Sequence, residues 1–187
     1  MRRKKKSISL EKFALILVDA NFERDLVINQ FNRLSDWSKE TETRDDKSSN
    51  TRFLEYLVFD LFTDRCCFLL VFSRQVTSML FETYFANTLV RLLGKGYKID
   101  NLQEFEALFN KREMEYAKYL NEYSPEYMKN LPSNYVPGLG KAFSINFVGW
   151  KDPGIIYAVH WDFVQKLRYI VKFLQEVAEK YEIVLQK

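Results

Sequence analysis

Apolar residues recur at helical spacing along most of this chain. Between about Ser9 and Trp37, Leu10 and other apolar residues repeat every three or four positions, which is typical of a helix with one buried face. Asp19 and Asn21 interrupt the pattern in its middle. We therefore expect two helices with a bend between them, the second capped at its N-terminus by Asn21.

Residues 51–93 contain no glycine and no proline, and apolar side chains cover nearly every side of the helix that they predict. A helix that is apolar all round lies at the centre of a bundle. A single helix of this length would span about 65 Å, which is too long for a domain of this size. We therefore expect a break near Thr63-Asp64, where either residue can cap a new helix. A buried strand over Cys66–Phe72 is the alternative for that stretch.

Capping signals mark the ends of further helices. Gly94-Lys95-Gly96 ends the central segment, because glycine adopts the left-handed conformation that helix C-termini use. Asp100 or Asn101 opens the next helix, with an amide or acidic residue three positions later. Ser124-Pro125 starts a short helix that runs to about Leu131.

The region between residues 125 and 154 holds all four prolines and four of the six glycines. Within it, Lys141–Val148 alternates apolar and polar residues, a period of two that is typical of a short β-strand. Asp152-Pro153 then starts the last helix, whose apolar stripe continues to about Leu185. These patterns predict an all-α bundle of five to seven helices with one long aromatic connection and one short β element.

A basic run, Arg2–Lys6, opens the sequence and accounts for its positive charge. The chain carries 28 Lys and Arg against 25 Asp and Glu, so the remainder is close to neutral without these five residues. We expect residues 1–8 to form a basic tail and residues 9–187 a single helical domain.

Aromatic residues make up 16% of the chain, including 16 Phe and 11 Tyr. Such side chains fill cores, and they are also enriched where proteins bind one another. The best location for a binding site is the connection from Ser133 to Trp150, because long ordered loops are often functional. The candidate ligand-binding or partner-binding residues are Tyr135, Lys141, Phe143, Phe147, Trp150, Lys151 and Trp161. The alternative is that these aromatic residues only close one end of the bundle.

Residues with catalytic potential are few. The single histidine, His160, lies two positions before Asp162 at the start of the last helix and could serve as a general base. The carboxylates of Glu55, Asp60 and Glu82 lie in the apolar central segment, but the Glu-x-x-His pair of bundle metal sites is absent from the sequence. We expect these three carboxylates to face solvent or to pair with Arg74 and Arg91, and we expect no metal and no cofactor.

The location expected from the sequence is cytoplasmic and reducing. Two adjacent cysteines, Cys66 and Cys67, match no disulfide framework and no zinc spacing. The sequence shows no secretory signal pattern, and no stretch approaches the ~20 apolar residues that span a bilayer.

Three functions fit these observations. The first is a non-enzymatic helical interaction protein that self-associates or binds a protein partner, with the basic tail contacting polyanions. The second is a small-molecule-binding or hydrolytic enzyme that uses His160 and Asp162 beneath the loop over residues 133–150. The third is non-specific binding of nucleic acid through Arg2, Arg3, Lys4, Lys5 and Lys6.

Overall fold

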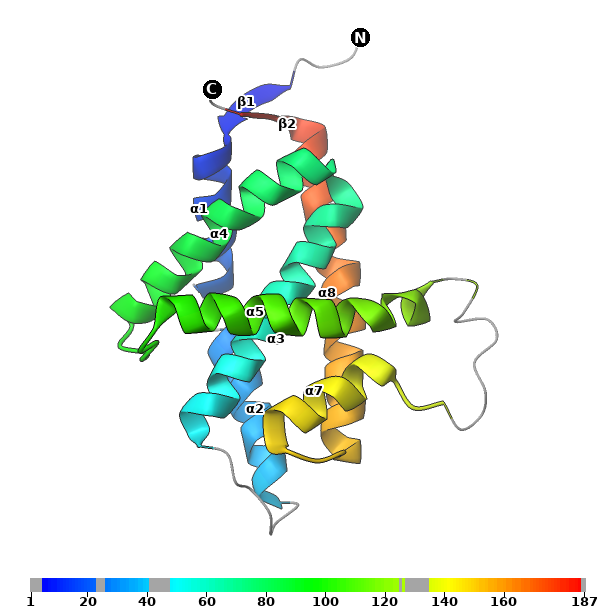
Figure 1. Cartoon of the computed structure of the whole chain (residues 1–187). Coiled ribbons are helices and arrows are strands. Elements are labelled where there is room, and N and C mark those ends of the chain that lie inside the picture. The colour runs from blue at the N-terminus through cyan, green and yellow to red at the C-terminus, as the bar shows by residue number, and fades with distance from the viewer. Residues whose placement is uncertain (1–4, 23–25, 41–47, 125, 127–134, 186–187) are drawn as a thin grey trace. The chain divides into compact units, whose positions relative to one another are not determined.

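A computed structural model describes residues 5–22, 26–40, 48–124, 126 and 135–185 (Figure 1). In these residues the strands are β1 (Lys6–Ser9) and β2 (Tyr181–Val184), and a 3₁₀ helix, η1, covers Ala117–Tyr123. The α-helices are α1 (Leu10–Phe22), α2 (Leu26–Glu40), α3 (Ser49–Val71), α4 (Arg74–Gly94), α5 (Leu102–Tyr116), α7 (Gly138–Val148) and α8 (Pro153–Lys180). Seven α-helices and one two-stranded sheet within the described residues confirm the predicted all-α bundle. None of the described helices is long and apolar enough to cross a membrane.

Side-chain caps start two helices where the sequence predicts them. The Asn101 side chain accepts hydrogen bonds from the backbone N–H groups of Gln103 (2.9 Å) and Glu104 (3.2 Å) at the start of α5. The Asp152 carboxylate accepts one from the N–H of Ile155 (3.0 Å) at the start of α8. These bonds satisfy N–H groups that have no partner within the helix, so both predicted starts are confirmed.

The first segment forms two helices, as expected, but Asn21 does not cap the second one. Asn21 lies within α1, and α2 begins at Leu26. The buried residues Phe13, Leu17 and Val18 continue the apolar stripe of α1 almost to Asn21. An N-cap residue needs a non-helical backbone, which Asn21 lacks because it is still inside α1.

The break in the central segment comes at Ser73, so the prediction of a break at Thr63-Asp64 is wrong. The Ser73 hydroxyl accepts a hydrogen bond from the N–H of Val76 (3.4 Å) and caps α4. Asp64 instead stays inside α3, where its buried carboxylate binds the side chains of Tyr84 and Lys166. The strand considered for Cys66–Phe72 is also wrong, since α3 continues to Val71.

The strand predicted for Lys141–Val148 is wrong, because these residues belong to α7. The apparent alternation hides a helical pattern: Leu139, Phe143 and Phe147 are four residues apart and fully buried, whereas Ile145 is exposed. Gly149 ends α7 with a φ of 93°, a left-handed conformation that glycine adopts without strain.

The β structure lies instead near the two ends of the sequence. β1 and β2 form a parallel two-stranded ribbon in which Lys6 is opposite Tyr181 and Ser9 is opposite Val184. We call this pair the terminal ribbon. The last helix accordingly ends at Lys180 and not near Leu185, because residues 181–184 are extended and pair with β1.

The contacts within the chain divide it into two compact units. Unit 1 comprises Met1–Val27, Thr63–Lys98 and Gln165–Lys187, and unit 2 comprises Ile28–Phe62 and Ile99–Val164. Helices α2, α3 and α8 each contribute residues to both units. The single domain expected for residues 9–187 stays a prediction, since units that share helices can belong to one domain.

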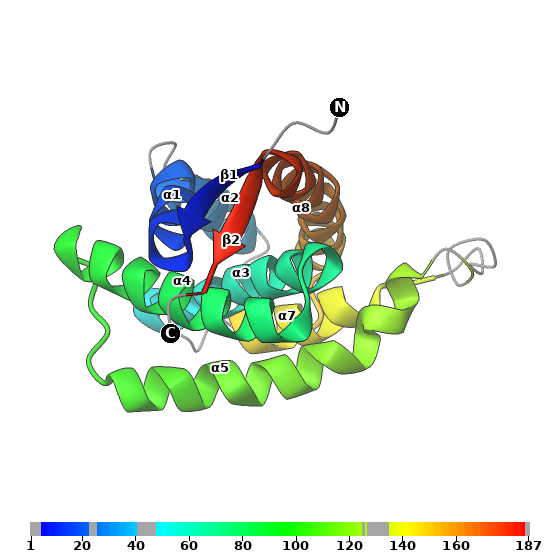
Figure 2. The same ribbon diagram turned by 90° about the horizontal axis from the view of Figure 1, so that it is seen from above.

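Unit 1 is built around the packing of α1 against α4, which lie next to each other in both views (Figures 1 and 2). The rings of Phe13 and Phe72 meet edge to face, with centroids 6.0 Å apart. An ion pair between Arg91 of α4 and Asp19 of α1 lies at the surface of the same helix pair. The terminal ribbon belongs to this unit, where β1 leads directly into α1.

Unit 2 has an aromatic core made by α3, α5, α7 and α8. The ring of Phe59 packs against those of Tyr116 and Phe143, with centroids 5.7 and 4.8 Å away. Phe62 stacks on Phe163 at 6.3 Å. Much of the unusual aromatic content of the sequence is therefore structural, since ring pairs of this geometry stabilise a core beyond the area they bury.

Candidate functional site

His160 lies in the first half of α8, half-buried among aromatic rings of unit 2. Its Nδ1 atom shares a hydrogen bond with the hydroxyl of Tyr123 (3.1 Å), and the two rings stack with centroids 5.4 Å apart. Burial lowers the pKa of His160 because it disfavours the imidazolium, and the negative charge of Glu122 opposes this shift only in part. Burial also raises the pKa of Tyr123 well above its usual range. Burial therefore favours the uncharged forms of both side chains.

Glu122 joins the segment around His160 to the start of α7. Its Oε2 atom accepts hydrogen bonds from the Tyr135 hydroxyl and from the backbone N–H of Gly138, each 2.8 Å long. A Cβ at position 138 would collide with Tyr119 and Glu122, and one at Gly140 would collide with the backbone carbonyl of Ile156. The glycines of this stretch thus allow α7 to pack closely against the segment of Tyr119 and Glu122 and against α8.

Asp162, the other predicted catalytic candidate, has a different partner from His160. Its carboxylate binds the Arg33 guanidinium of α2, with an N–O distance of 2.5 Å. Within the described residues, His160 bonds to Tyr123 and Asp162 bonds to Arg33, so the carboxylate does not orient the imidazole. A general base that relies on an acidic partner would need that contact.

The aromatic candidates of the predicted loop separate into buried and exposed residues. Phe143 and Phe147 are fully buried and stack on each other with centroids 5.1 Å apart. The backbone carbonyl of Trp150 accepts a hydrogen bond from the Ser144 hydroxyl (2.7 Å), which fixes the turn before α8. Lys141 is half-buried, and Lys151 is exposed. The alternative that these aromatic residues close part of the core therefore fits Phe143 and Phe147.

Trp161 is the predicted candidate whose large side chain stays at the surface. It is 62% exposed, and Tyr157, one turn earlier on α8, is 49% exposed. The Tyr157 hydroxyl donates a hydrogen bond to the backbone carbonyl of Tyr135 (3.2 Å), so its ring is held in place. We call Tyr157 and Trp161 the exposed aromatic pair. The sequence indicated Trp161 but gave no sign that Tyr157 belongs with it.

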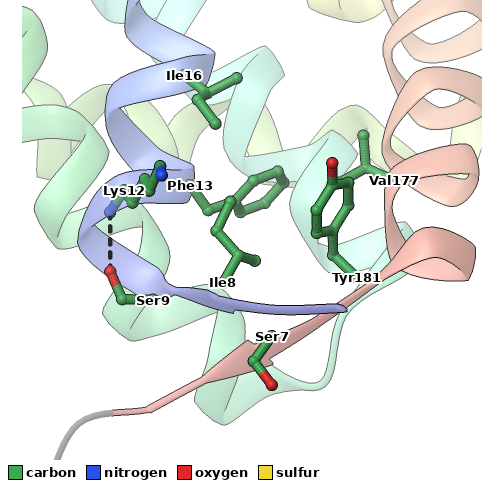
Figure 3. Close-up of a pocket in the computed structure, with 8 residues that line it drawn as sticks. All are labelled: Ser7, Ile8, Ser9, Lys12, Phe13, Ile16, Val177 and Tyr181. Carbon is green, nitrogen blue, oxygen red and sulfur yellow. Dashed lines mark hydrogen bonds between the residues drawn. The ribbon is translucent and has the colours of Figure 1, made fainter. Parts of the chain in front are cut away.

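Unit 1 contains a groove beneath the terminal ribbon, with a volume of about 500 Å³ (Figure 3). Figure 3 shows Ile8 and Phe13 facing the same space as Val177 and Tyr181. The lining residues come from β1, α1 and the junction of α8 with β2: Ser7, Ile8, Ser9, Lys12, Phe13, Ile16, Val177 and Tyr181. Sequence reasoning missed this groove because its walls are far apart in the chain and no motif links them.

The prediction that the carboxylates of the central segment face solvent or pair with Arg74 and Arg91 is wrong for Glu55 and is confirmed for Glu82. Glu55 is buried and receives two hydrogen bonds from the Arg112 guanidinium, 2.8 and 2.6 Å long. Asp60 is buried as well, whereas Glu82 is exposed and accepts a hydrogen bond from the Ser78 hydroxyl (3.3 Å). The described residues contain no group of acidic, histidine or cysteine side chains arranged to hold a metal ion.

The basic run is described in part. Arg2, Arg3 and Lys4 lie outside the described residues. Lys5 donates a hydrogen bond from its ammonium to the backbone carbonyl of Ala178 (2.6 Å), near the C-terminus of α8, and Lys6 is the first residue of β1. A cation at a helix C-terminus is favourable, so Lys5 has a structural use beside any contact with a polyanion.

Comparison with known proteins adds no functional assignment. No family model matches the chain, and neither the curated proteins nor the solved structures contain a significant match to it.

Proposed function

We propose that this protein is a non-enzymatic interaction protein that self-associates through a surface containing the exposed aromatic pair. The observation that carries the proposal is the exposure of Trp161 with Tyr157 one helical turn away. Tryptophan and tyrosine are the residues most enriched among those that dominate binding energy in protein interfaces. A buried tryptophan would need no partner, but an indole that is 62% exposed leaves a large apolar surface in water.

The surroundings of the exposed aromatic pair resemble the make-up of an interface. Asp162 follows Trp161 in α8 and forms an ion pair with Arg33 of α2, whose side chain is about half exposed. Protein interfaces commonly place apolar anchors at the centre and charged groups at the rim. We propose a second copy of this chain as the partner, because most soluble oligomers are symmetric assemblies of one chain.

The contacts of His160 and Asp162 support a non-enzymatic role over a hydrolytic one. His160 uses its Nδ1 atom for Tyr123, and Asp162 uses its carboxylate for Arg33. Both groups contribute to packing within unit 2. We also propose a reducing intracellular location, which suits two buried cysteines that form no disulfide within the described residues.

Light scattering on the full chain and its Trp161→Ala variant tests the proposal. Loss of an anchor residue typically costs about 2 kcal/mol or more, which corresponds to at least about a 30-fold rise in the dimer dissociation constant. Tyr169→Ala is the matched control, since Tyr169 is an aromatic residue of α8 with a similar exposure of 64%. Circular dichroism checks that both variants keep their helices.

A dimer that Trp161→Ala weakens and Tyr169→Ala does not is the expected result. A wild-type chain that stays monomeric at high micromolar concentration contradicts self-association. A dimer that Trp161→Ala weakens no more than Tyr169→Ala does overturns the assignment to the exposed aromatic pair.

A further inference from the structure

The groove beneath the terminal ribbon has the size and lining of a ligand site. Its volume of about 500 Å³ falls within the roughly 300–1,000 Å³ of typical small-molecule pockets. Five of the lining residues are apolar or aromatic: Ile8, Phe13, Ile16, Val177 and Tyr181. They belong to separate elements, so an apolar group in the groove contacts side chains from β1, α1 and the end of α8.

The positive charge of Lys12 favours ligands that combine an apolar chain with a negative charge. Lys12 is the charged residue among those that line it, and Ser7 and Ser9 supply the other polar side chains. The Ser9 hydroxyl accepts a hydrogen bond from the backbone N–H of Lys12 (3.3 Å), which ties the start of α1 to β1 (Figure 3). Within the described residues the Lys12 ammonium has no carboxylate partner, so an anion at this position gains a counterion without displacing one.

We propose that this groove binds an anionic amphiphile, a free fatty-acid anion whose chain lies on the apolar lining and whose carboxylate pairs with Lys12. A single ammonium matches a head group with a single negative charge, whereas phosphate groups are usually held by arginine or by several cationic groups. The site is independent of the proposed self-association, because its lining residues all belong to unit 1 and the exposed aromatic pair belongs to unit 2.

Titration of the full chain with three twelve-carbon probes tests the charge preference. The probes are laurate, dodecanol and dodecyltrimethylammonium, each below its micelle concentration, and binding is followed by calorimetry and by displacement of the fluorophore ANS. We expect laurate to bind several-fold more tightly than the other two, because an exposed ion pair contributes a factor of roughly two to five. Lys12→Glu should reverse this order and favour the cationic probe.

Two neighbouring residues of α1 provide a matched pair of variants. Ile16 lines the groove and is 42% exposed, whereas Leu15 does not line it and is 47% exposed. Ile16→Glu places a carboxylate against the bound chain and should weaken laurate binding by at least about tenfold, since it removes apolar contact and adds repulsion. Leu15→Glu adds the same charge one residue away and should leave the affinity within about twofold.

Several outcomes overturn the proposal. The first is a wild-type chain that does not bind laurate. The second is equal affinity for the anionic and cationic probes. The third is an equal loss of binding in Ile16→Glu and Leu15→Glu, which would indicate adsorption to the surface of α1. Binding to vesicles of phosphatidylglycerol without binding to laurate would identify a membrane-contacting surface and would also overturn the assignment to a free fatty acid.

Discussion

Two buried carboxylates of helix α3, Glu55 in unit 2 and Asp64 in unit 1, are neutralised in different ways. In unit 2, Glu55 meets the planar fork of Arg112, which donates to both carboxylate oxygens. In unit 1, Asp64 divides its oxygens between the ammonium of Lys166 (2.9 Å) and the hydroxyl of Tyr84 (2.7 Å). An arginine satisfies a carboxylate alone, whereas a lysine is a point charge and leaves room for a second donor.

The arginine of unit 2 is also the centre of a larger network. Arg112 binds Glu115 (2.9 Å), and Glu115 accepts a hydrogen bond from the Asn146 amide (3.1 Å), so α3, α5 and α7 are linked. Burial by itself would lower the pKa of Arg112, but the hydrogen bonds and charge of Glu55 raise it above its ordinary value. Networks of this kind are costly to break at one point, because the remaining groups stay buried without partners.

The largest expected effect comes from removing the arginine of unit 2. Arg112→Met leaves the buried Glu55 carboxylate without a counterion and should lower the free energy of unfolding by about 3–5 kcal/mol. Urea unfolding followed by circular dichroism measures the change. Lys111→Met, at the exposed neighbouring position, is the control and should stay within about 0.5 kcal/mol of the wild type.

A double variant distinguishes the loss of the Arg112–Glu55 attraction from the cost of leaving the Glu55 carboxylate buried without a partner. Arg112→Met combined with Glu55→Leu removes both charges, and it should recover at least half of the lost stability if the unpaired carboxylate is the main cost. A double variant that is no more stable than Arg112→Met would show that the rest of the network carries the stability.

A smaller effect is expected for the corresponding residue of unit 1. Lys166→Met should cost about 2 kcal/mol, because Asp64 keeps its hydrogen bond from Tyr84. Lys172→Met, at an exposed position of the same helix, is the control. Tyr84→Phe should cost more in the Lys166→Met background than in the wild type, since the two donors share one carboxylate. Additive costs, measured by urea unfolding, would contradict this sharing.

The smallest expected effect on stability comes from His160 of unit 2, and it depends on pH. Its lowered pKa means that, as the pH falls below about 6.5, the unfolded chain takes up a proton that the folded chain resists. The uncharged His160 side chain therefore makes its full contribution to stability above this pH. That contribution is lost as the pH falls through the lower pKa that His160 has in the folded state. Unfolding free energies measured between pH 7.5 and 5.5 should fall more steeply for the wild type than for His160→Gln. Parallel pH profiles would show that His160 does not contribute.

The sequence predicted those parts of the fold that depend on neighbours along the chain. Asn101 and Asp152 cap helices through N–H groups two or three residues away, so both helix starts could be predicted from the local sequence. Asp64 has the same capping chemistry, but its partners Tyr84 and Lys166 come from other helices, and these contacts keep it inside α3. Local propensity is overridden wherever a distant partner satisfies the polar group.

The candidate sites show the same limit. Trp161 was identified as a candidate from its residue type, but its exposure depends on how α8 packs. The groove could not be predicted from the sequence, because β1 and β2 have only four residues each and neither is recognisable as a strand without the other. Residues 181–184 instead continue an apolar helical pattern, which is why the last helix was predicted to be too long.

The terminal ribbon also has a consequence for synthesis of the chain on the ribosome. Ser9 is opposite Val184, so β1 emerges early and waits for its partner until nearly all of the described chain has been made. Unit 2 uses no residue beyond Val164 and can assemble while the end of α8 is still being translated. Unit 1 depends on residues from Gln165 onward, so its groove forms only after Tyr181 has been added to the chain. Until then, Ile8 and Phe13 are accessible to chaperones, because Val177 and Tyr181, which line the groove with them, have not yet been synthesised.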